Sequence, residues 1–376
     1  MRVLCSQENL AKGLNVVSRA VSTRSTLPVL ANVLLATDEG RLKLSATNLE
    51  IVITCWIEAQ VEEEGATTVP ARTFNDLISA LPQEQVYLDL HEETETLHVS
   101  AARTEADIKG IDAEEFPLVP EREDENRIRV DPAPFKEMIR QVTFAAATDD
   151  ARPTLTGIYT HFEGETLTMV ATDGFRLSQR TVRLPGYVEE PQTVIVPARA
   201  LDEVARVMDE ENEDTFVLLP EGRNQIIFDM GNILVVSQLI DGNFPDFRAV
   251  IPKSHKTRTV LNTASFLKAC KTADIFAREA SHTARVEINP AGESPGHAII
   301  SATSTETGSN EAQVDADVEG DAVELNFNVK YLTDVLGVVG TPQVALETTS
   351  PVEPGVVKSV GEDDFVHIIM PMQFGR

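Results

Sequence analysis

The sequence has few of the residues that would give it a disulfide framework, a membrane span or a metal centre. Its three cysteines, Cys5, Cys55 and Cys270, are too far apart for a disulfide framework and fit a reducing cytoplasm. The N-terminal segment lacks the apolar core of a signal peptide, and no apolar run approaches the roughly 20 residues of a membrane span. The seven histidines show no metal-ligand spacing. We therefore predict a cytoplasmic protein with no metal and no cofactor.

Catalytic signatures are equally scarce. No cysteine has a histidine nearby in sequence, and there is no GxxxxGK[ST] phosphate-binding loop, which excludes an ATPase of that type. The pairs Asp149-Asp150 and Asp363-Asp364 could in principle hold a metal. Such pairs are expected by abundance in a chain with 60 acidic residues. The sequence therefore predicts a protein that is not an enzyme.

Positive charge is scarce as well. The 376 residues include 32 Lys and Arg against 60 Asp and Glu, a net charge of −28. A uniformly acidic surface would repel nucleic acid. The total charge alone therefore argues against a DNA-binding protein.

An amphipathic helix pattern occurs three times in the chain. Each copy has the i, i+3, i+4, i+7 spacing of one helical face, and the copies start 125 and then 131 residues apart. The three faces consist of Leu10, Gly13, Leu14 and Val17; Phe135, Met138, Ile139 and Val142; and Phe266, Ala269, Cys270 and Ala273.

Two further segment types recur in the same order with nearly the same period. Alternating strands over residues 42–50, 167–175 and 298–306 end in turn formers at Asn48, Asp173 and Ser304. A second helix follows each strand, and its faces consist of Phe74, Leu77, Ile78 and Leu81; Leu201, Val204, Ala205 and Met208; and Leu332, Val335, Leu336 and Val339. Ile111-Asp112 is matched by Ile240-Asp241.

The repeats predict three tandem domains of one fold, with boundaries at residues 1–122, 123–253 and 254–376. Each repeat would hold two helices separated by runs of strand. This order favours an α+β fold with antiparallel sheets over a doubly wound α/β fold.

The predicted helices have a small net positive charge, whereas the rest of the chain is strongly acidic. Residues 8–25, 132–146 and 264–278 carry +2, +1 and +2, and the second helices are neutral, so the remainder carries −33. If the helices line one surface, that surface can meet phosphates while the rest of the protein repels them. Charge alone leaves open that these Lys and Arg residues only solvate the helices.

Seven segments carry a resemblance to a known family: LPVLANVLL (27–35), GATTVPAR (65–72), ATDGFRL (171–177), VIVPAR (194–199), DGNFPDFR (241–248), FNVKYLTDVL (327–336) and MPMQF (370–374). With these segments the chain resembles the beta subunit of bacterial DNA polymerase III, the sliding-clamp family. The resemblance covers essentially the whole chain and coincides with the repeats. It implies a non-enzymatic clamp whose protomer closes head-to-tail with a second copy into a ring around duplex DNA. Such a ring would slide without sequence specificity and tether the replicative polymerase.

For DNA, the resemblance implies contacts from Arg24 and Arg72, with Arg199 as a further candidate. Pro153 and Thr154 stand where the family often has aromatic groups near DNA, so stacking is not expected from these positions.

The resemblance also implies a groove between the second and third domains that binds short peptides. Its partners would be the DNA polymerase III catalytic subunit, the clamp loader and other proteins with clamp-binding motifs. The matching positions are Leu155, Thr172, Gly174, Phe175, Arg176, Leu177, Pro245, Val250, Asn328, Tyr331, Ile369, Met370, Pro371 and Met372. Phe175 replaces a frequent His and Ala249 a frequent Arg. From the residues alone, MPMQF could instead be a final core strand and ATDGFRL a strand-end turn.

The ring seam would bring the strand around Ala106 and Ile108 against Ile275 and Phe276 of the second copy. Ala106 is small where the family often has a bulky residue. Core burial of Ile275 and Phe276 is an equally good interpretation. For the whole chain, the alternative to a clamp is an acidic three-repeat protein–protein scaffold that does not encircle DNA.

Overall fold

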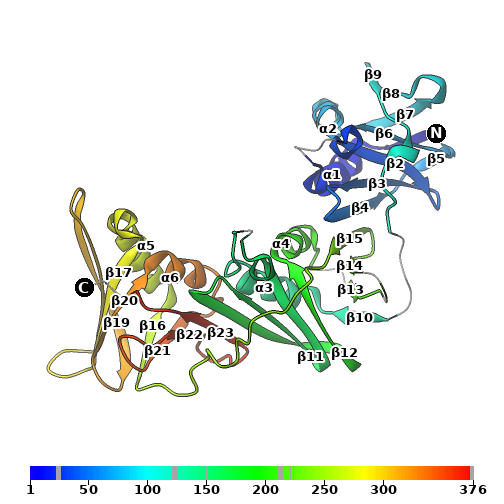
Figure 1. The fold of residues 1–376 in the computed structure, drawn as a ribbon. Helices are drawn as coiled ribbons and strands as arrows, with labels where there is room; N and C mark the ends of the chain where they lie inside the picture. Colours follow the sequence, from blue (N-terminus) through cyan, green and yellow to red (C-terminus); the bar gives the residue numbers. More distant parts are fainter. Residues whose placement is uncertain are drawn as a thin grey trace. The chain divides into compact units, whose positions relative to one another are not determined.

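The structure is a computed structural model that describes residues 1–22, 27–120, 126–149, 151–210, 215–220, 222 and 224–372. These residues form two compact units, labelled by element in Figure 1. Unit 1 comprises Met1–Ala133 and Ala200–Leu239, and unit 2 comprises Pro134–Arg199 and Ile240–Arg376.

Unit 1 contains two antiparallel sheets. The five-stranded sheet has the order β5-β1-β7-β8-β9 and consists of β1 (Arg2–Ser6), β5 (Gln60–Glu63), β7 (Gln85–His91), β8 (Thr96–Ala101) and β9 (Thr104–Lys109). The eight-stranded sheet has the order β10-β13-β14-β15-β4-β3-β2-β6 and consists of β2 (Asn32–Asp38), β3 (Arg41–Thr47), β4 (Ile51–Ile57), β6 (Ala66–Pro70), β10 (Arg127–Val130), β13 (Thr215–Leu218), β14 (Gln225–Asp229) and β15 (Ile233–Gln238).

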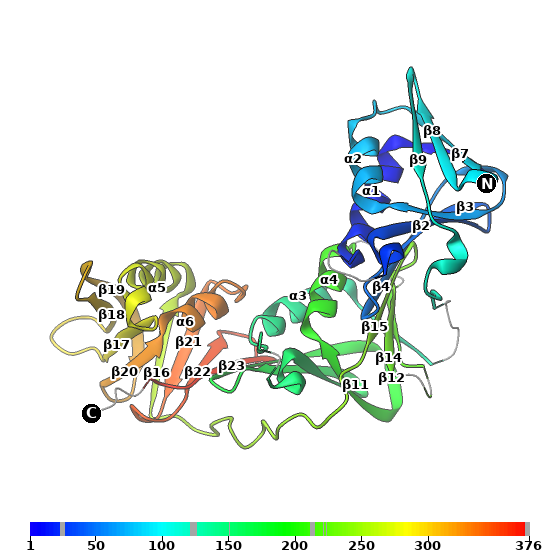
Figure 2. The same ribbon diagram turned by 45° about the horizontal axis from the view of Figure 1, so that its top comes forward.

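Helices α1 (Gln7–Val17) and α2 (Ala71–Ala80) contact each other, and α1 packs on β3 and β4 (Figure 2). The Ser6 side chain caps α1 by accepting a hydrogen bond from the Asn9 backbone N–H. Gly13 lies where α1 meets the sheet, and a Cβ atom there would be 2.7 Å from Leu44 Cδ1. Glycine therefore sets how closely the helix approaches the strands. Helix α4 (Ala198–Val207) carries the second-helix pattern of the second repeat.

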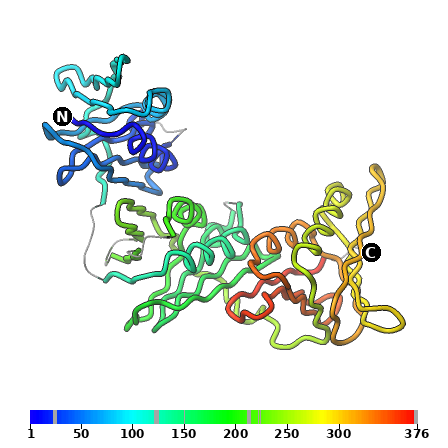
Figure 3. The backbone as a smooth tube through the Cα atoms, turned by 180° about the vertical axis from the view of Figure 1, so that it is seen from behind, coloured from blue at the N-terminus to red at the C-terminus, as the bar shows by residue number. Residues whose placement is uncertain are grey.

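Unit 2 contains a ten-stranded sheet with the order β11-β12-β23-β22-β21-β16-β19-β18-β17-β20. The strands are β11 (Gly157–Thr172), β12 (Arg176–Pro197), β16 (Thr257–Asn262), β17 (Thr283–Asn289), β18 (His297–Ser304), β19 (Gly308–Glu319), β20 (Val323–Asn328), β21 (Gln343–Thr348), β22 (Gly355–Ser359) and β23 (Phe365–Ile369). Its helices are α3 (Pro132–Thr143), α5 (Thr263–Ala277) and α6 (Val329–Leu336). Helix α5 packs on α6 and on β17 to β19, and the β18–β19 hairpin projects beyond its neighbours (Figure 3).

The structure confirms the three predicted repeats and the α+β class with antiparallel sheets. All six predicted helices form, although Leu81, Met208 and Val339, the last residues of the second-helix patterns, lie just beyond the helix ends and are buried there. In the described part of the chain, no helix is long and apolar enough to cross a membrane.

The three predicted turns also form, and their side chains close them in the same way. Asn48 Oδ1 accepts from the Ile51 N–H at 2.9 Å, and Asp173 Oδ1 accepts from the Arg176 N–H at 3.0 Å. In the third repeat Ser304 Oγ accepts from the backbone N–H of residue 307 at 3.1 Å. The chain therefore reverses at equivalent points in all three repeats.

Candidate functional site: two strand joins and a groove

Two antiparallel strand pairs connect successive repeats edge to edge. In the first join, β15 of the second repeat lies beside β4 of the first repeat, with Val236 opposite Val52. In the second join, β23 of the third repeat lies beside β12 of the second repeat, with Ile368 opposite Leu177. Val52 and Leu177 are equivalent, because each lies across the turn from the Thr of the repeated Ala-Thr pair. The two joins therefore have the same register.

The first join is mainly apolar. Trp56, Leu234 and Val236 belong to a buried cluster, with Val52 and Phe216 packed against it. Charged groups lie at its border, where Arg41 lies over the Trp56 ring and donates to Asn232, and also elsewhere between the two repeats. Glu203 of α4 is 3.5 Å from the Arg19 guanidinium and 2.9 Å from that of Arg206.

In the second join, side chains that face the helices are polar. Ser178 Oγ donates to the Gln141 carbonyl oxygen of α3 at 2.8 Å and lies 3.0 Å from His367 Nδ1. Burial, with a smaller contribution from the Arg176 charge, lowers the His367 pKa to about 3. Nε2 of this ring has no hydrogen-bond partner among the described residues. His367 is therefore neutral at physiological pH and belongs to the packing of the join.

The turn between β11 and β12 lies at the end of this join. Asp173 Oδ1 accepts from the Phe175 and Arg176 N–H groups at 2.9 and 3.0 Å, and Thr172 Oγ1 accepts from the Gly174 N–H at 3.1 Å. Gly174 has a φ of +92° and a Cβ atom there would lie 3.0 Å from Arg152, so glycine suits this position. The Met370 N–H donates to the Phe175 carbonyl oxygen at 2.9 Å, which fixes the turn against the end of β23.

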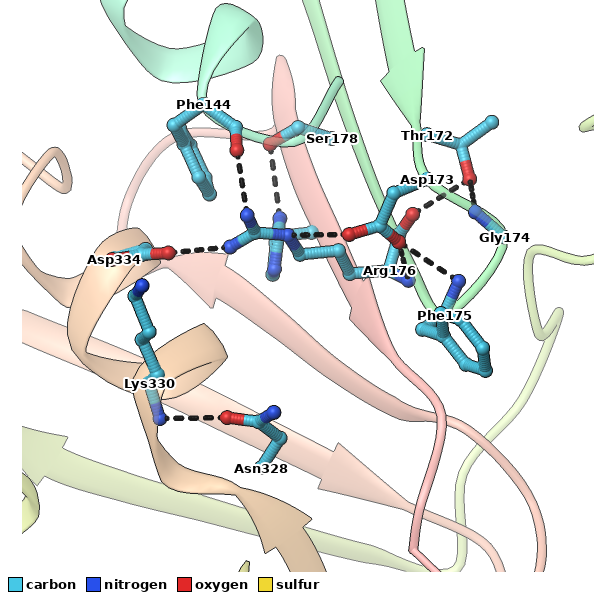
Figure 4. A network of polar contacts seen from close by, with 11 residues as sticks. Phe144, Thr172, Asp173, Gly174, Phe175, Arg176, Ser178, Asn328, Lys330 and Asp334 are labelled. Atoms are coloured by element: carbon cyan, nitrogen blue, oxygen red, sulfur yellow. Dashed lines mark hydrogen bonds and ion pairs between the residues drawn. The ribbon is translucent and has the colours of Figure 1, made fainter. Parts of the chain in front are cut away.

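Arg176 connects the turn to α6 of the third repeat and to the segment that follows α3 in its own repeat (Figure 4). Its guanidinium is 3.1 Å from Asp173 Oδ2 and 2.6 Å from Asp334 Oδ2 of α6, and it donates to the Phe144 carbonyl oxygen at 2.7 Å. It also lies over the Tyr331 ring, 4.4 Å from the centroid. The Arg176 side chain is only 10% exposed, so these groups replace water around a nearly buried charge.

The opposite side of the second join is apolar and partly uncovered. Val170, Leu177, Phe247 and Ile368 form a buried cluster, and Phe244, Tyr159, Ile251 and Val366 pack against it. Phe175, Val250 and Met370 remain 58%, 45% and 37% exposed. Exposed large apolar side chains that gather on one side of a sheet are typical of a surface that binds a partner.

A cleft of about 440 Å³ lies under the segment that follows Phe247. Its lining includes Tyr159, His161 and Gln179 from the strands and Arg248 and Lys253 from the segment above them. Within the described residues, no group of three His, Cys, Asp or Glu side chains is placed to hold a metal. Asp364 pairs instead with Arg180 at 2.5 Å, so it has a structural partner. Asp150 lies outside the described residues.

Comparison with known families accounts for nearly the whole chain. Three family models match it in order: the DNA polymerase III beta subunit N-terminal domain over residues 1–120, the central domain over 129–246 and the C-terminal domain over 248–373. A beta sliding clamp of Staphylococcus epidermidis is 31% identical, and the match covers 96% of each chain. The chain belongs to the DNA polymerase III beta subunit family, the beta sliding clamps.

Similar proteins and solved structures agree with this assignment. The beta sliding clamp of Bacillus subtilis is 28% identical over 99% of this chain and 100% of its own length. A crystal structure of the Bacillus subtilis DNA polymerase sliding clamp matches with a TM-score of 0.93 and 27% identity, and one of the Pseudomonas aeruginosa DNA polymerase III subunit beta with 0.90 and 30%; each covers 100% of both chains. Members of this family are non-enzymatic processivity factors, and this chain functions as a DNA sliding clamp.

The groove residues expected from the resemblance lie around the second join, but with different exposures. Phe175, Val250 and Met370 offer apolar surface, whereas the Leu155, Leu177 and Ile369 side chains are buried. Asn328 caps α6 by accepting from the Lys330 N–H, so its side chain has a structural role. Pro245 is exposed, and Pro371 and Met372 are half-buried. Tyr331 is half-buried under Arg176.

Of the three expected DNA-contacting residues, Arg24 lies outside the described residues. The Arg72 side chain is 96% exposed on α2 and lies 3.9 Å from Asp76, and Arg199 is exposed at the start of α4. Both side chains are therefore accessible to solvent.

The expected seam residues differ from one another. Ile108 of β9 is only 7% exposed, and Ala106 is half-buried. Ile275 of α5 is 56% exposed, so this side chain is not buried in the core. Phe276 is half-buried and packs against the core of unit 2. The low exposure of Ile108 means that this side chain packs within its own unit.

Sequence reasoning missed three features of the site. Phe144 and Asp334 bind Arg176, but they are 32 and 158 residues away from it in the chain. The cluster around Phe247 was also missed. Alignment of the repeats could have signalled Arg176, because it occupies the position of Ile51 in the first repeat and a charge replaces an apolar residue there.

Proposed function

We propose that two copies of this chain close head-to-tail into a ring around duplex DNA. One observation carries the proposal: β15 with β4 and β23 with β12 pair in the same register, so one type of contact links successive repeats. The same contact leaves one edge unused at each end of the series. Among the strands that the structure describes, these are β9, at the end of its sheet, and residues 308–315 of β19, which pair only with β18. A heterologous contact of this kind gives a closed ring when its rotation closes.

The expected seam residues fit this pairing. Ala106 and Ile108 lie on β9, and Ile275 and Phe276 lie on α5, which packs over β19. The exposed Ile275 would gain cover from a second copy, and an unpaired strand edge would gain backbone hydrogen bonds.

DNA contacts would come from the helices. Lys12, Arg72, Arg199, Lys268 and Lys271 are all exposed on helices, whereas the strands and loops carry most of the acid. Such side chains can meet phosphates without reading sequence. Because a ring is retained by topology, a few weak contacts would suffice and would permit sliding.

The groove at the second join would bind peptides from the polymerase III catalytic subunit, the clamp loader and other proteins with clamp-binding motifs. The exposed Phe175, Val250 and Met370 side chains support this role. A flexible methionine can adapt to different peptides. The site of action would be the cytoplasm, and the buried free thiols of all three cysteines fit that compartment.

Retention on circular DNA tests the ring. We expect the clamp, loaded onto nicked circular duplex, to stay bound through gel filtration and to be lost after the circle is cut once, because the ring slides off the ends. The uncut circle serves as the control. Equal retention on both forms would contradict the topological model, and absence of loader-dependent DNA association would favour the scaffold alternative.

A further inference from the structure

We infer that the seam of this ring sets glutamate against glutamate, so that closure is favoured by salt that screens them. The inference rests on the proposed ring and adds the register and chemistry of its seam. The partner at this surface is a second copy of the chain. The two internal joins serve as templates for the seam.

The register on β19 follows from the repeated turn. Thr47 and Thr172 of the repeated Ala-Thr pairs lie opposite Val52 and Leu177, the residues that meet the neighbouring repeat. In the third repeat Thr303 lies opposite Ser309. Ser309 is therefore the residue of β19 that corresponds to Val52 and Leu177.

The register on β9 follows from the matching Ile-Asp segments. Val236 of the first join lies four residues before Ile240, and Asp107 lies four residues before Ile111. Asp107 should therefore face Ser309 of the second copy, as Val236 faces Val52. Because the strands are antiparallel, Glu105 then faces Glu311 of the second copy.

The two glutamates lie on the same face of the joined strands, with the exposed Arg103 two residues before Glu105. Both glutamates are exposed, and in the part of the chain that the structure describes neither makes an ion pair. Asp107 adds a third carboxylate on this face, although His98 Nδ1 lies 2.8 Å from its Oδ1. The Lys109 ammonium donates to Thr96 at 2.7 Å. Like charges directly opposite each other on neighbouring strands destabilise the pair.

On the other face of the joined strands, the strand residues themselves offer little apolar packing against this repulsion. Ala106 would face Asn310, and both are half-buried. Asn310 Oδ1 is buried and has no hydrogen-bond partner among the described residues. The corresponding pair in the first join is Ile53 with Val235, both fully buried. At these strand positions the seam thus has the backbone pairing of the internal joins without their apolar packing, which leaves Ile275 of α5 as its exposed apolar group.

The sign of the salt dependence distinguishes this seam from one held by ion pairs. Salt shortens the Debye length from about 14 Å to about 4 Å between roughly 50 and 500 mM. An attractive seam would weaken over this range. The repulsive seam should tighten, so the dimer dissociation constant should fall.

Charge exchange at the two glutamates tests the register. The dimer dissociation constant of the full chain is measured by analytical ultracentrifugation at roughly 50 and 500 mM NaCl. Glu105→Lys and Glu311→Lys should each tighten the dimer at low salt by about tenfold, because each places Lys opposite Glu at both seams. The double variant should lose this gain, since Lys then faces Lys. Glu353→Lys, an exposed loop residue away from both edges, makes the same change in net charge and should have little effect.

The outcomes separate the inference from the ring itself. A double variant that binds tighter than either single variant would show a general charge effect and would overturn the register, as would single variants no tighter than Glu353→Lys. A parent dimer that weakens with salt would overturn the repulsive seam. If no variant dimerises at any concentration, the proposed ring fails, and the inference fails with it.

Discussion

The two internal joins share a backbone register but differ in the side chains that fill them. At three positions that face the helices, the first join has apolar residues where the second has polar ones, whereas Ser237 of the first join corresponds to the apolar Ile369 of the second. The equivalent pairs are Ile51 and Arg176, Ile53 and Ser178, and Val235 and His367. An equivalent backbone hydrogen bond ends each join. The Gln238 N–H donates to the Glu50 carbonyl oxygen in the first join, and the Met370 N–H donates to the Phe175 carbonyl oxygen in the second, both at 2.9 Å.

The difference shows that main-chain pairing fixes the register of both joins, while the side chains give each join its own role. In the first join, close-packed apolar groups hold two repeats together and need no directional contacts. In the second join, Arg176 connects the groove turn to α6 through Asp334 and to the end of the α3 segment through Phe144. This network fixes the turn that presents Phe175. A polar network has this effect only when its members are satisfied.

The largest effect on stability should come from replacing Arg176 with the apolar residue that the first join has at the equivalent position. Arg176→Ile copies Ile51 but leaves Asp173 and Asp334 without the guanidinium between them. We expect the free energy of unfolding of unit 2 to fall by about 3 kcal/mol, as is typical when one partner of a buried ion pair is removed. Urea denaturation followed by circular dichroism measures this loss.

The matched control is Arg183→Ala in the same strand. The Arg183 side chain is 87% exposed and lies 3.4 Å from Glu165, so its loss should change stability by no more than about 0.5 kcal/mol. If Arg176→Ile were as stable as this control, the polar network would not hold the join.

A smaller effect should appear in acid at His367. Its pKa is about 3 in the folded chain against an ordinary value of 6.5, so between these values the unfolded chain binds a proton that the folded chain does not. The contribution of His367 is complete above pH 6.5 and is lost as the pH falls, by about 1.4 kcal/mol per pH unit. His367→Val, which copies Val235, should remove this part of the slope.

Denaturation midpoints at several pH values between 6.5 and about 4.5 measure the effect. His91→Val is the control, because His91 is exposed on β7 in unit 1. If both variants retained the slope of the parent protein, burial of neutral His367 would not be a source of acid sensitivity.

Much of the fold could be predicted from the sequence because the helices and turns of each repeat follow from short-range residue patterns. The i, i+3, i+4, i+7 faces predicted six helices, and Asn48, Asp173 and Ser304 predicted three turns that the structure confirms. Helix ends were less predictable, since buried residues such as Leu81 continue the apolar pattern after the helix has ended.

The site was less accessible to sequence reasoning because it depends on contacts between distant strands. Leu177 and Ile368 share one cluster although 191 residues separate them, and no local pattern records which edges meet. Alternation alone also gave no warning that Ile369 lies in the core while its neighbour Met370 is exposed. The resemblance supplied the groove, and the exposures show which of its residues offer surface.

The smallest effect on stability, and the sharpest on function, should come from exchanging Phe175 for its counterpart. The equivalent residue in the first join is Glu50, which ends the same kind of turn. Because Phe175 is 58% exposed, Phe175→Glu should leave the free energy of unfolding within about 0.5 kcal/mol of the parent. It should weaken binding of a clamp-binding peptide from the polymerase III catalytic subunit by at least about tenfold, as loss of an aromatic anchor does.

Fluorescence anisotropy with a labelled peptide measures this change. The control is Tyr187→Glu, at another exposed aromatic residue of β12, which should bind the peptide as the parent does. Peptide binding that survives Phe175→Glu unchanged would move the groove away from this turn, whereas equal loss in both variants would mean that added negative charge, rather than the aromatic ring, decides binding.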